Sequence, residues 1–204
     1  MNKVEDMFFR YFLPASLLAY LFTALFWRSY VVWKKTGINP VTLKNFDTAH
    51  GFVGRAYKLT FVLLVLVVLV YALSPAAYAY LAPIRWLEHP SLQRIGTAFV
   101  IFSLIWTIIA QAQMGEAWRI GIDTEHRTPL VQKGLFRISR NPIYIGGVIT
   151  LSGLFLIIPN ALTLLILILG LVLIGVQVRF EEEHVRKMHP REYAEYCQRV
   201  RRWL

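Results

Sequence analysis

Five long runs of apolar residues, separated by polar segments, dominate the chain. They lie at Tyr11–Trp33, Leu59–Leu81, Leu92–Met114, Pro142–Ile158 and Ala161–Val178. An α-helix rises about 1.5 Å per residue, so about 20 apolar residues are needed to cross a bilayer. The pattern therefore predicts an all-α integral membrane protein with five transmembrane helices. Only Pro159-Asn160 separates the last two runs, which predicts a tight helical hairpin.

The polar segments divide the chain into two regions. Residues 1–112 contain the first three predicted spans and a long loop at residues 34–58. Residues 113–204 contain a second polar loop, the last two spans and a polar tail that is expected to form a C-terminal helix. Ser74-Pro75 interrupts the second apolar run, and proline breaks the hydrogen-bonding pattern of a helix. A kink or an early helix end is therefore predicted there.

The composition supports a membrane location. Hydrophobic residues make up 56% and charged residues 17% of the chain, with a mean hydropathy of +0.49. Soluble domains contain about 45–50% apolar and about 25% charged residues. The net charge is +10, but the basic residues lie between the apolar runs and form no nucleic-acid-binding motif. We therefore expect contact with membrane lipid and no nucleic-acid partner.

The Lys and Arg residues are distributed unevenly between the two sides of the predicted membrane. Four of the 22 lie in residues 1–11, residues 82–94 and the Pro159-Asn160 turn. The other 18 lie in residues 28–58, residues 115–141 and the tail from residue 179. Cytoplasmic segments carry the excess of basic residues. The distribution predicts that the N-terminus is outside and the C-terminal tail is cytoplasmic.

Polar side chains gather at both ends of the predicted hairpin. Arg137, Arg140, Asn141 and Tyr144 precede or open its first helix, and Glu181, Glu182 and Glu183 follow its second. Because a hairpin returns to the membrane face where it began, these groups are expected to lie close together. Two alternatives stay open at this point. In one, the basic residues serve topology alone; in the other, the acidic residues form a solvated face that pairs with Arg186 and Lys187.

The histidine and cysteine residues do not indicate a metal site. His126, His184 and His189 lack a spacing typical of metal ligands, and Cys197 is the only cysteine. No metal cofactor is therefore expected.

Short motifs follow one another in residues 113–204. Gly134-Leu135-Phe136-Arg137 precedes Ser139-Arg140-Asn141-Pro142-Ile143-Tyr144, and an apolar stretch then leads to Glu181-Glu182 and the tail Arg191-Glu192-Tyr193-Ala194-Glu195-Tyr196. This order and spacing resemble the isoprenylcysteine carboxyl methyltransferase family, which groups with membrane phospholipid methyltransferases. Asn141 replaces the family's histidine, and His189-Pro190 replaces its Phe-Gly pair.

The resemblance implies methyl transfer from S-adenosylmethionine by a bacterial-type member of the family, located in the inner membrane. Arg140 and Glu182 are then the expected catalytic residues. The expected cofactor-binding residues are Arg137, Asn141, Pro142, Tyr144 and Glu181. The expected acceptor is a lipophilic small molecule or a lipid-linked group. Carboxyl O-methylation of an isoprenylcysteine-like compound is the leading hypothesis.

Three alternatives to this function remain open at the level of sequence. They are N-methylation of a phospholipid amine, an NADPH-dependent membrane reductase with a similar scaffold, and a non-catalytic membrane scaffold. No predicted span carries a charged residue near its middle, so an ion pathway is not indicated. The sequence does not distinguish O-, N- and S-methylation.

Overall fold

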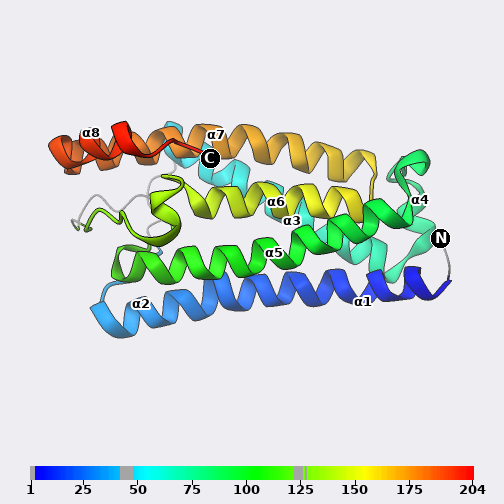
Figure 1. Cartoon of the computed structure of the whole chain (residues 1–204). Helices are drawn as coiled ribbons and strands as arrows, with labels where there is room; N and C mark the ends of the chain where they lie inside the picture. The colour runs from blue at the N-terminus through cyan, green and yellow to red at the C-terminus, as the bar shows by residue number, and fades with distance from the viewer. Residues whose placement is uncertain (1–2, 42–47, 122–125, 127) are drawn as a thin grey trace.

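The computed structural model of the chain describes residues 3–41, 48–121, 126 and 128–204. It is an elongated bundle of helices (Figure 1), and the described residues form no strand beyond two isolated bridges. The elements are α1 (Lys3–Tyr20), η1 (Leu21–Trp27), α2 (Arg28–Thr36), α3 (Ala49–Leu73), α4 (Pro75–Ala79), η2 (Arg85–Leu87), α5 (Pro90–Met114), η3 (Gly115–Ala117), η4 (Gly134–Arg137), α6 (Pro142–Ile157), α7 (Ala161–Met188) and α8 (Pro190–Arg199). The predicted all-α fold is confirmed.

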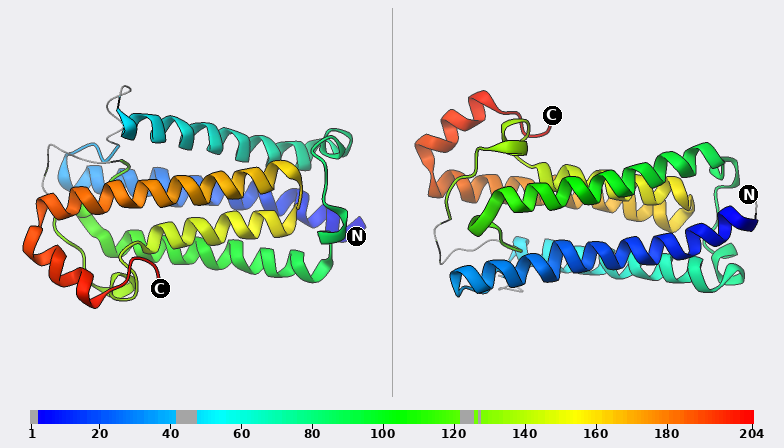
Figure 2. Two further views of the ribbon diagram at one scale, coloured as in Figure 1. Left: turned by 90° about the horizontal axis from the view of Figure 1, so that it is seen from above. Right: turned by 60° about the horizontal axis from the view of Figure 1, so that its bottom comes forward.

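Four of the long helices form a layer, and the long helical stretch at the N-terminus packs against one side of it. Helices α3, α7, α6 and α5 lie side by side in that order, as the view from above shows (Figure 2). The continuous stretch of α1, η1 and α2 packs against α3 and α5. The N-terminus and α4 lie at one end of the bundle, and α8 lies at the other. The polar segments around α8 are thereby brought together at a single end.

Four helical stretches are long and apolar enough to cross a membrane. Within the described residues these are Glu5–Thr36, Ala49–Leu73, Pro90–Ala117 and Ala161–Met188. Helix α6 is also apolar but has 16 residues, which corresponds to about 24 Å against a hydrocarbon core of about 30 Å. The apolar spans are thus confirmed, whereas the predicted count of five is not established, because α6 is short.

Several helices extend further than the predicted spans: the first stretch runs from Lys3 to Thr36 rather than from Tyr11 to Trp33, and α3 and α7 each continue well beyond one predicted end. Helix α3 begins at Ala49, where the Thr48 side chain caps it by accepting a hydrogen bond from Gly51 N at 3.1 Å. Part of the predicted loop at residues 34–58 is therefore helical, and residues 42–47 of that loop lie outside the described residues. Helix α7 continues beyond the predicted end at Val178 as far as Met188, so the glutamate run is helical.

Both sharp breaks predicted from proline occur. Helix α3 ends at Leu73, and Pro75 begins α4 after the Ser74 cap. In the hairpin, Asn160 caps α7 by accepting from Thr163 N at 3.0 Å, while its own N–H donates to Thr163 Oγ1 at 3.1 Å. This reciprocal capping ends α6 and begins α7 within a few residues. The tight hairpin is therefore confirmed.

Glycines allow α5 and α6 to pack closely. Gly96 of α5 and Gly153 of α6 face each other, and a Cβ atom added to either would lie 2.7 Å from the carbonyl oxygen of the other. Small residues at such positions let helix backbones approach closely in a membrane. This contact fixes α6, which opens the candidate site, against the bundle.

The variant Gly153→Ala is expected to lower the melting temperature of the detergent-solubilised protein. Overpacking a tight contact costs about 1–3 kcal/mol, and here the nearest atom is a backbone carbonyl oxygen, which cannot rotate away. Thermal unfolding followed by circular dichroism measures the effect. Gly54→Ala is the matched control, since nothing lies within 4 Å of its added Cβ. Equal melting temperatures for the two variants would contradict the packing argument.

Candidate active site

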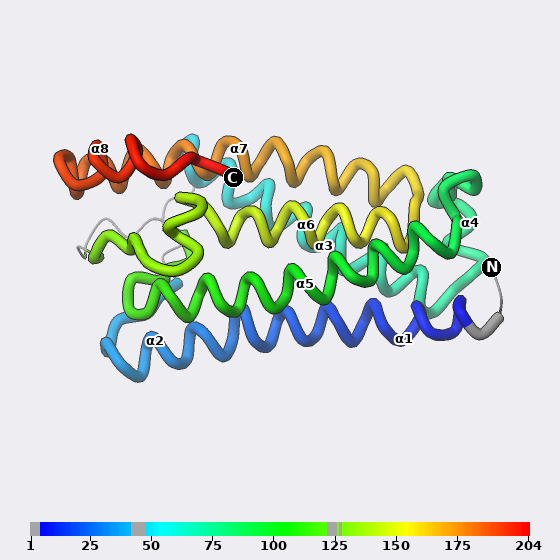
Figure 3. Tube along the Cα trace, in the orientation of Figure 1, coloured from blue at the N-terminus to red at the C-terminus, as the bar shows by residue number. Residues whose placement is uncertain are grey.

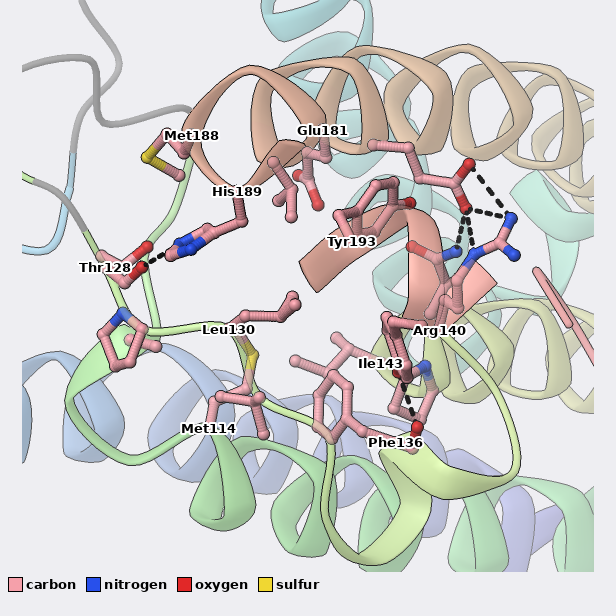
Figure 4. A pocket seen from close by; sticks show the side chains of 18 of the residues that line it. Met114, Thr128, Leu130, Phe136, Arg140, Ile143, Glu181, Met188, His189 and Tyr193 are labelled. Atoms are coloured by element: carbon pink, nitrogen blue, oxygen red, sulfur yellow. Dashed lines mark hydrogen bonds and ion pairs between the residues drawn. The ribbon is translucent and has the colours of Figure 1, made fainter. Parts of the chain in front are cut away.

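A polar cavity of about 140 Å³ lies at the end of the bundle that carries α8. Its wall is formed by the end of α5, residues 128–131, η4, the start of α6, the last part of α7 and α8. Figure 4 shows Arg140, Glu181 and His189 around this space, with Leu130 and Phe136 among its apolar walls. The cavity therefore combines charged groups with an apolar surface.

Glu182 lies at the centre of a buried charge cluster and is only 6% exposed. Arg140 donates from Nε to Glu182 Oε1 at 3.2 Å, and Arg202 donates from Nη2 to Oε2 at 2.8 Å. Asn141 Nδ2 donates to Oε1 at 3.0 Å. The hydrogen bond from Arg202 to Glu182 raises the pKa of Arg202 above its ordinary value. Two guanidinium groups and an amide thus hold this carboxylate in place.

The segment after α8 folds back over the start of α6, as the trace in Figure 3 shows. The backbone N–H of Arg140 donates to Arg201 O at 3.0 Å, and its Nη1 donates to Val200 O at 2.9 Å. Ser139 Oγ and Asn141 Nδ2 both donate to Arg202 O, at 3.1 and 3.2 Å. The C-terminal residues therefore hold the entry of α6 in its bent conformation.

The two tail tyrosines, Tyr193 and Tyr196, secure α8. Tyr193 and Tyr196 are buried in one apolar cluster. Tyr196 donates its hydroxyl to Phe136 O at 2.6 Å, and burial raises the pKa of Tyr196 to about 12. Since the hydroxyl keeps its proton, it remains a donor that ties α8 to η4.

Glu181 has surroundings different from those of its neighbour. The Tyr144 hydroxyl donates to the Glu181 carboxylate, and Gln177 Nε2 donates to it at 2.9 Å. Among the described residues Glu181 forms no ion pair with a basic side chain. Successive residues of a helix point about 100° apart. The adjacent carboxylates of Glu181 and Glu182 are therefore held in separate environments, and only that of Glu182 is neutralised by arginine.

A second cavity, about 360 Å³ in volume, lies inside the bundle. It is lined by residues of α1, α3, α5, α6 and α7, mostly aliphatic and aromatic, such as Leu17, Leu64 and Leu154. It shares Ile143 and Tyr144 with the polar cavity. Ligand sites typically measure about 300–1,000 Å³. The polar cavity thus adjoins an apolar cavity whose volume is typical of a ligand site.

The structure brings together six of the seven predicted site residues. Arg140, Asn141, Pro142, Tyr144, Glu181 and Glu182 all line the polar cavity. Arg137 does not; it is exposed at the end of η4. The predicted proximity of the two hairpin ends is confirmed by the Arg140–Glu182 ion pair. Of the three glutamates, Glu183 is the exposed one, and it pairs with Lys187 at 2.7 Å.

Several polar residues in or beside the two cavities were not among the predicted site residues, and three of them are Arg202, Gln177 and Tyr57. Arg202 lies in the polar tail and reaches Glu182, and Gln177 lies within an apolar run and reaches Glu181. The Tyr57 hydroxyl is buried in α3 without a hydrogen-bond partner among the described residues, and Tyr57 lines the apolar cavity. In the described ranges no group of three or more His, Cys, Asp or Glu side chains could hold a metal ion.

The fold and the two cavities define a helical membrane protein with a charged site beside an apolar chamber. A family model described as phospholipid methyltransferase matches residues 92–192, about half of the chain and all the predicted site residues. The chain belongs to the superfamily of membrane isoprenylcysteine and phospholipid methyltransferases, and it is a membrane methyltransferase. Comparison with curated proteins and with solved structures found no match.

Proposed function

We propose that this chain transfers a methyl group from S-adenosylmethionine to a lipophilic acceptor. The observation that carries the proposal is the junction of the two cavities at Ile143 and Tyr144. A water-soluble donor suits the polar cavity, and the apolar chain of an acceptor suits the apolar cavity inside the bundle. Methyl transfer requires the two molecules to meet in line at one point.

The side chains of the polar cavity fit the groups of the donor. Arg140 has five N–H donors, of which three are used within the described chain, so two remain for a carboxylate. The carboxylate of Glu181 suits an ammonium group or ribose hydroxyls. Phe136 and Leu130 offer apolar surface to a purine ring. Asn141 and Pro142 form the start of α6 in the wall of the same cavity.

When bound, S-adenosylmethionine supplies a methyl group already activated on a sulfonium ion. The protein's own work is then to align the acceptor, to exclude water and to accept a proton where the acceptor carries one. Glu182, which the sequence resemblance assigns as catalytic, is engaged by Arg140 and Arg202. We therefore assign proton acceptance to Glu181, and we assign to Glu182 the positioning of Arg140.

The apolar cavity supports an acceptor with a lipophilic chain, and two acceptor classes fit. Carboxyl O-methylation of an isoprenylcysteine-like or other small lipophilic compound needs no base, since a carboxylate is ionised at neutral pH. N-methylation of a phospholipid amine needs one. The family description favours N-methylation of a phospholipid amine. The carboxylate of Glu181 also favours it, because this group lies beside Tyr144 without an arginine partner in the described part of the chain and can accept a proton.

Calorimetric titration in detergent tests the proposed donor. Binding of S-adenosylmethionine and S-adenosylhomocysteine with an affinity in the micromolar range is expected, and NADPH is expected not to bind. Binding of NADPH alone would favour a membrane reductase. Binding of neither by the folded protein would favour a scaffold without catalytic activity.

We propose that the polar cavity faces the cytoplasm and the N-terminus lies outside, in a bacterial inner membrane. Cys197 lies on α8, and Tyr80, which is 89% exposed, lies beyond α4 near the opposite end. A membrane-impermeant maleimide is expected to label a Tyr80→Cys, Cys197→Ser variant in intact cells. It is expected to label wild-type Cys197 only after permeabilisation. The reverse pattern would contradict this orientation.

A further inference from the structure

Three buried polar residues follow one face of α5 in the middle of the bundle. Ser103, Thr107 and Gln111 are spaced four residues apart and are 0%, 5% and 5% exposed. They lie inside the apolar stretch Pro90–Ala117. Polar groups at such depth are costly unless they are hydrogen bonded, and they mark functional positions in many membrane proteins. Their partners therefore need to be accounted for one by one.

Ser103 belongs to a complete cluster of hydroxyl groups. Tyr20 donates its hydroxyl to Ser103 Oγ at 2.7 Å and lies 2.6 Å from Thr150 Oγ1. Ser103 and Thr150 donate in turn to the backbone oxygens of Val100 and Gly146, at 3.0 and 2.9 Å. Each hydroxyl has a partner, and the cluster joins α1, α5 and α6. A structural role, as hydrogen bonding between helices, explains these three residues.

Thr107 is not explained in this way. Its Oγ1 atom is buried and has no hydrogen-bond partner within the described part of the chain. The Tyr20 hydroxyl interacts with Thr107 outside hydrogen-bond geometry, and it already has two oxygen partners, at 2.7 and 2.6 Å. Thr107 lines the apolar cavity. The Thr107 hydroxyl, which can donate and accept, therefore lacks a well-formed hydrogen bond to any described residue at the wall of a ligand-sized space, and a buried polar group without one is costly.

An irregular helix at the same level is an independent sign of a binding position. The π-helical segment η1 begins at Leu21, directly after Tyr20. Gln111 Nε2 donates to the carbonyl of Ala24 within it at 3.1 Å. Tyr20, Ala24 and Gln111 all line the apolar cavity. π-Helical turns are rare and occur frequently at functional sites.

The unpaired hydroxyl lies close to the junction of the two cavities. A Cβ added to Gly146 would lie 2.2 Å from Thr107 Oγ1, so this atom is level with Gly146. Gly146 follows Tyr144 by two residues, which corresponds to a rise of about 3 Å along α6. Gly146 and Tyr144 point in nearly opposite directions on α6, but Thr107 and Tyr144 line the same cavity, so a group bound by Thr107 would lie at nearly the same depth as the junction.

We propose that Thr107 binds a hydroxyl or carbonyl oxygen on the lipophilic part of the methyl acceptor. The inference rests on the proposed function, in which the apolar cavity holds that acceptor. An acceptor with an oxygen at this level satisfies Thr107, whereas a plain hydrocarbon chain leaves it unpaired. Thr107 thus selects oxygenated lipids, and the Tyr20–Ser103–Thr150 cluster holds the neighbouring wall.

The test compares Thr107→Val with Thr97→Val as matched control. Thr97 lies on the same helix, outside the cavity, and donates to Gln93 O at 2.8 Å. The probes are octadecanoic acid and hydroxyoctadecanoic acids that carry the hydroxyl at successively more distant carbons. Their affinities are measured calorimetrically in detergent without donor, so the result does not depend on methyl transfer.

Wild type and Thr97→Val are expected to bind one of the hydroxy acids about three- to tenfold more tightly than the parent acid, as one neutral hydrogen bond allows. In Thr107→Val this preference disappears, while the parent acid binds as before. The melting temperature of Thr107→Val is expected not to fall, because the lost hydroxyl has no partner.

Equal binding of all probes by wild type would overturn the inference, as would a preference that persists in Thr107→Val. Failure of every acid to bind would overturn the assignment of the cavity to a lipid chain. A clear fall in the melting temperature of Thr107→Val would point to a structural role instead. The titration with S-adenosylmethionine decides the proposed function separately, since it involves the other cavity.

Discussion

Replacing Glu181 by glutamine is expected to lower methyl transfer to a phospholipid amine at least about 100-fold. General base catalysis typically contributes about 10²–10⁴ in rate. Glutamine keeps the shape of the side chain, but it cannot take a proton from an ammonium group. Transfer of labelled methyl from S-adenosylmethionine to phosphatidylethanolamine measures the effect. With a farnesylcysteine acceptor only the smaller loss that comes from weaker donor binding is expected, because that carboxylate arrives ionised and needs no base.

Glu183→Gln provides the matched control. Glu183 is exposed and pairs with Lys187 on the outer face of α7, so its loss is expected to leave both reactions unchanged. Equal rates for the Glu181 and Glu183 variants with the amine acceptor would refute the assigned base. Equal losses by the Glu181 variant with both acceptors would instead restrict Glu181 to donor binding.

Deletion of residues 201–204 is expected to weaken the binding of S-adenosylhomocysteine at least about 100-fold. The deleted segment supplies two backbone oxygens that accept from Arg140 N, Ser139 Oγ and Asn141 Nδ2, and the guanidinium that holds Glu182. Net contributions of about 0.5–1.5 kcal/mol for each hydrogen bond add up to a loss of this size. Calorimetry measures the affinity, and gel filtration shows whether the variant remains folded.

Two point variants separate the side chain from the backbone in this segment. Arg202→Gln removes the contact with Glu182, and about a tenfold loss of affinity is expected. Arg201→Gln removes only an exposed side chain and keeps the backbone oxygen that Arg140 uses. We expect it to bind like the wild type. A deletion variant that is folded and binds with wild-type affinity would rule out the role of the C-terminal segment.

The lengths of the apolar runs predicted the helical fold. The hairpin between the last two runs predicted that Arg140 and Glu182 lie close together. A short turn returns the chain to its starting level, whatever the side chains do. Helix ends were less accurate, since hydropathy indicates where lipid contact ends rather than where the helix ends. Helix α7 therefore continues through polar residues to Met188, and α3 begins at the Thr48 cap.

The separate surroundings of the two glutamates could not be predicted. Glu181 and Glu182 are adjacent and identical in type, and only the direction in which each points on α7 separates arginine contact from contact with Tyr144. Arg202 joins the site through a reversal of the chain after α8, which no periodic pattern indicates. Thr107 lies within an apolar run, where a single hydroxyl hardly changes the hydropathy.

In the proposed reaction, the junction at Ile143 and Tyr144 also determines how the reactants and products would travel. A water-soluble molecule and a lipid reach it through different cavities, so neither has to pass the place occupied by the other. The spent donor then returns to water, and the methylated lipid stays in the bilayer. Each substrate therefore has its own product as a competitor, and an excess of lipid does not block the entry of fresh donor.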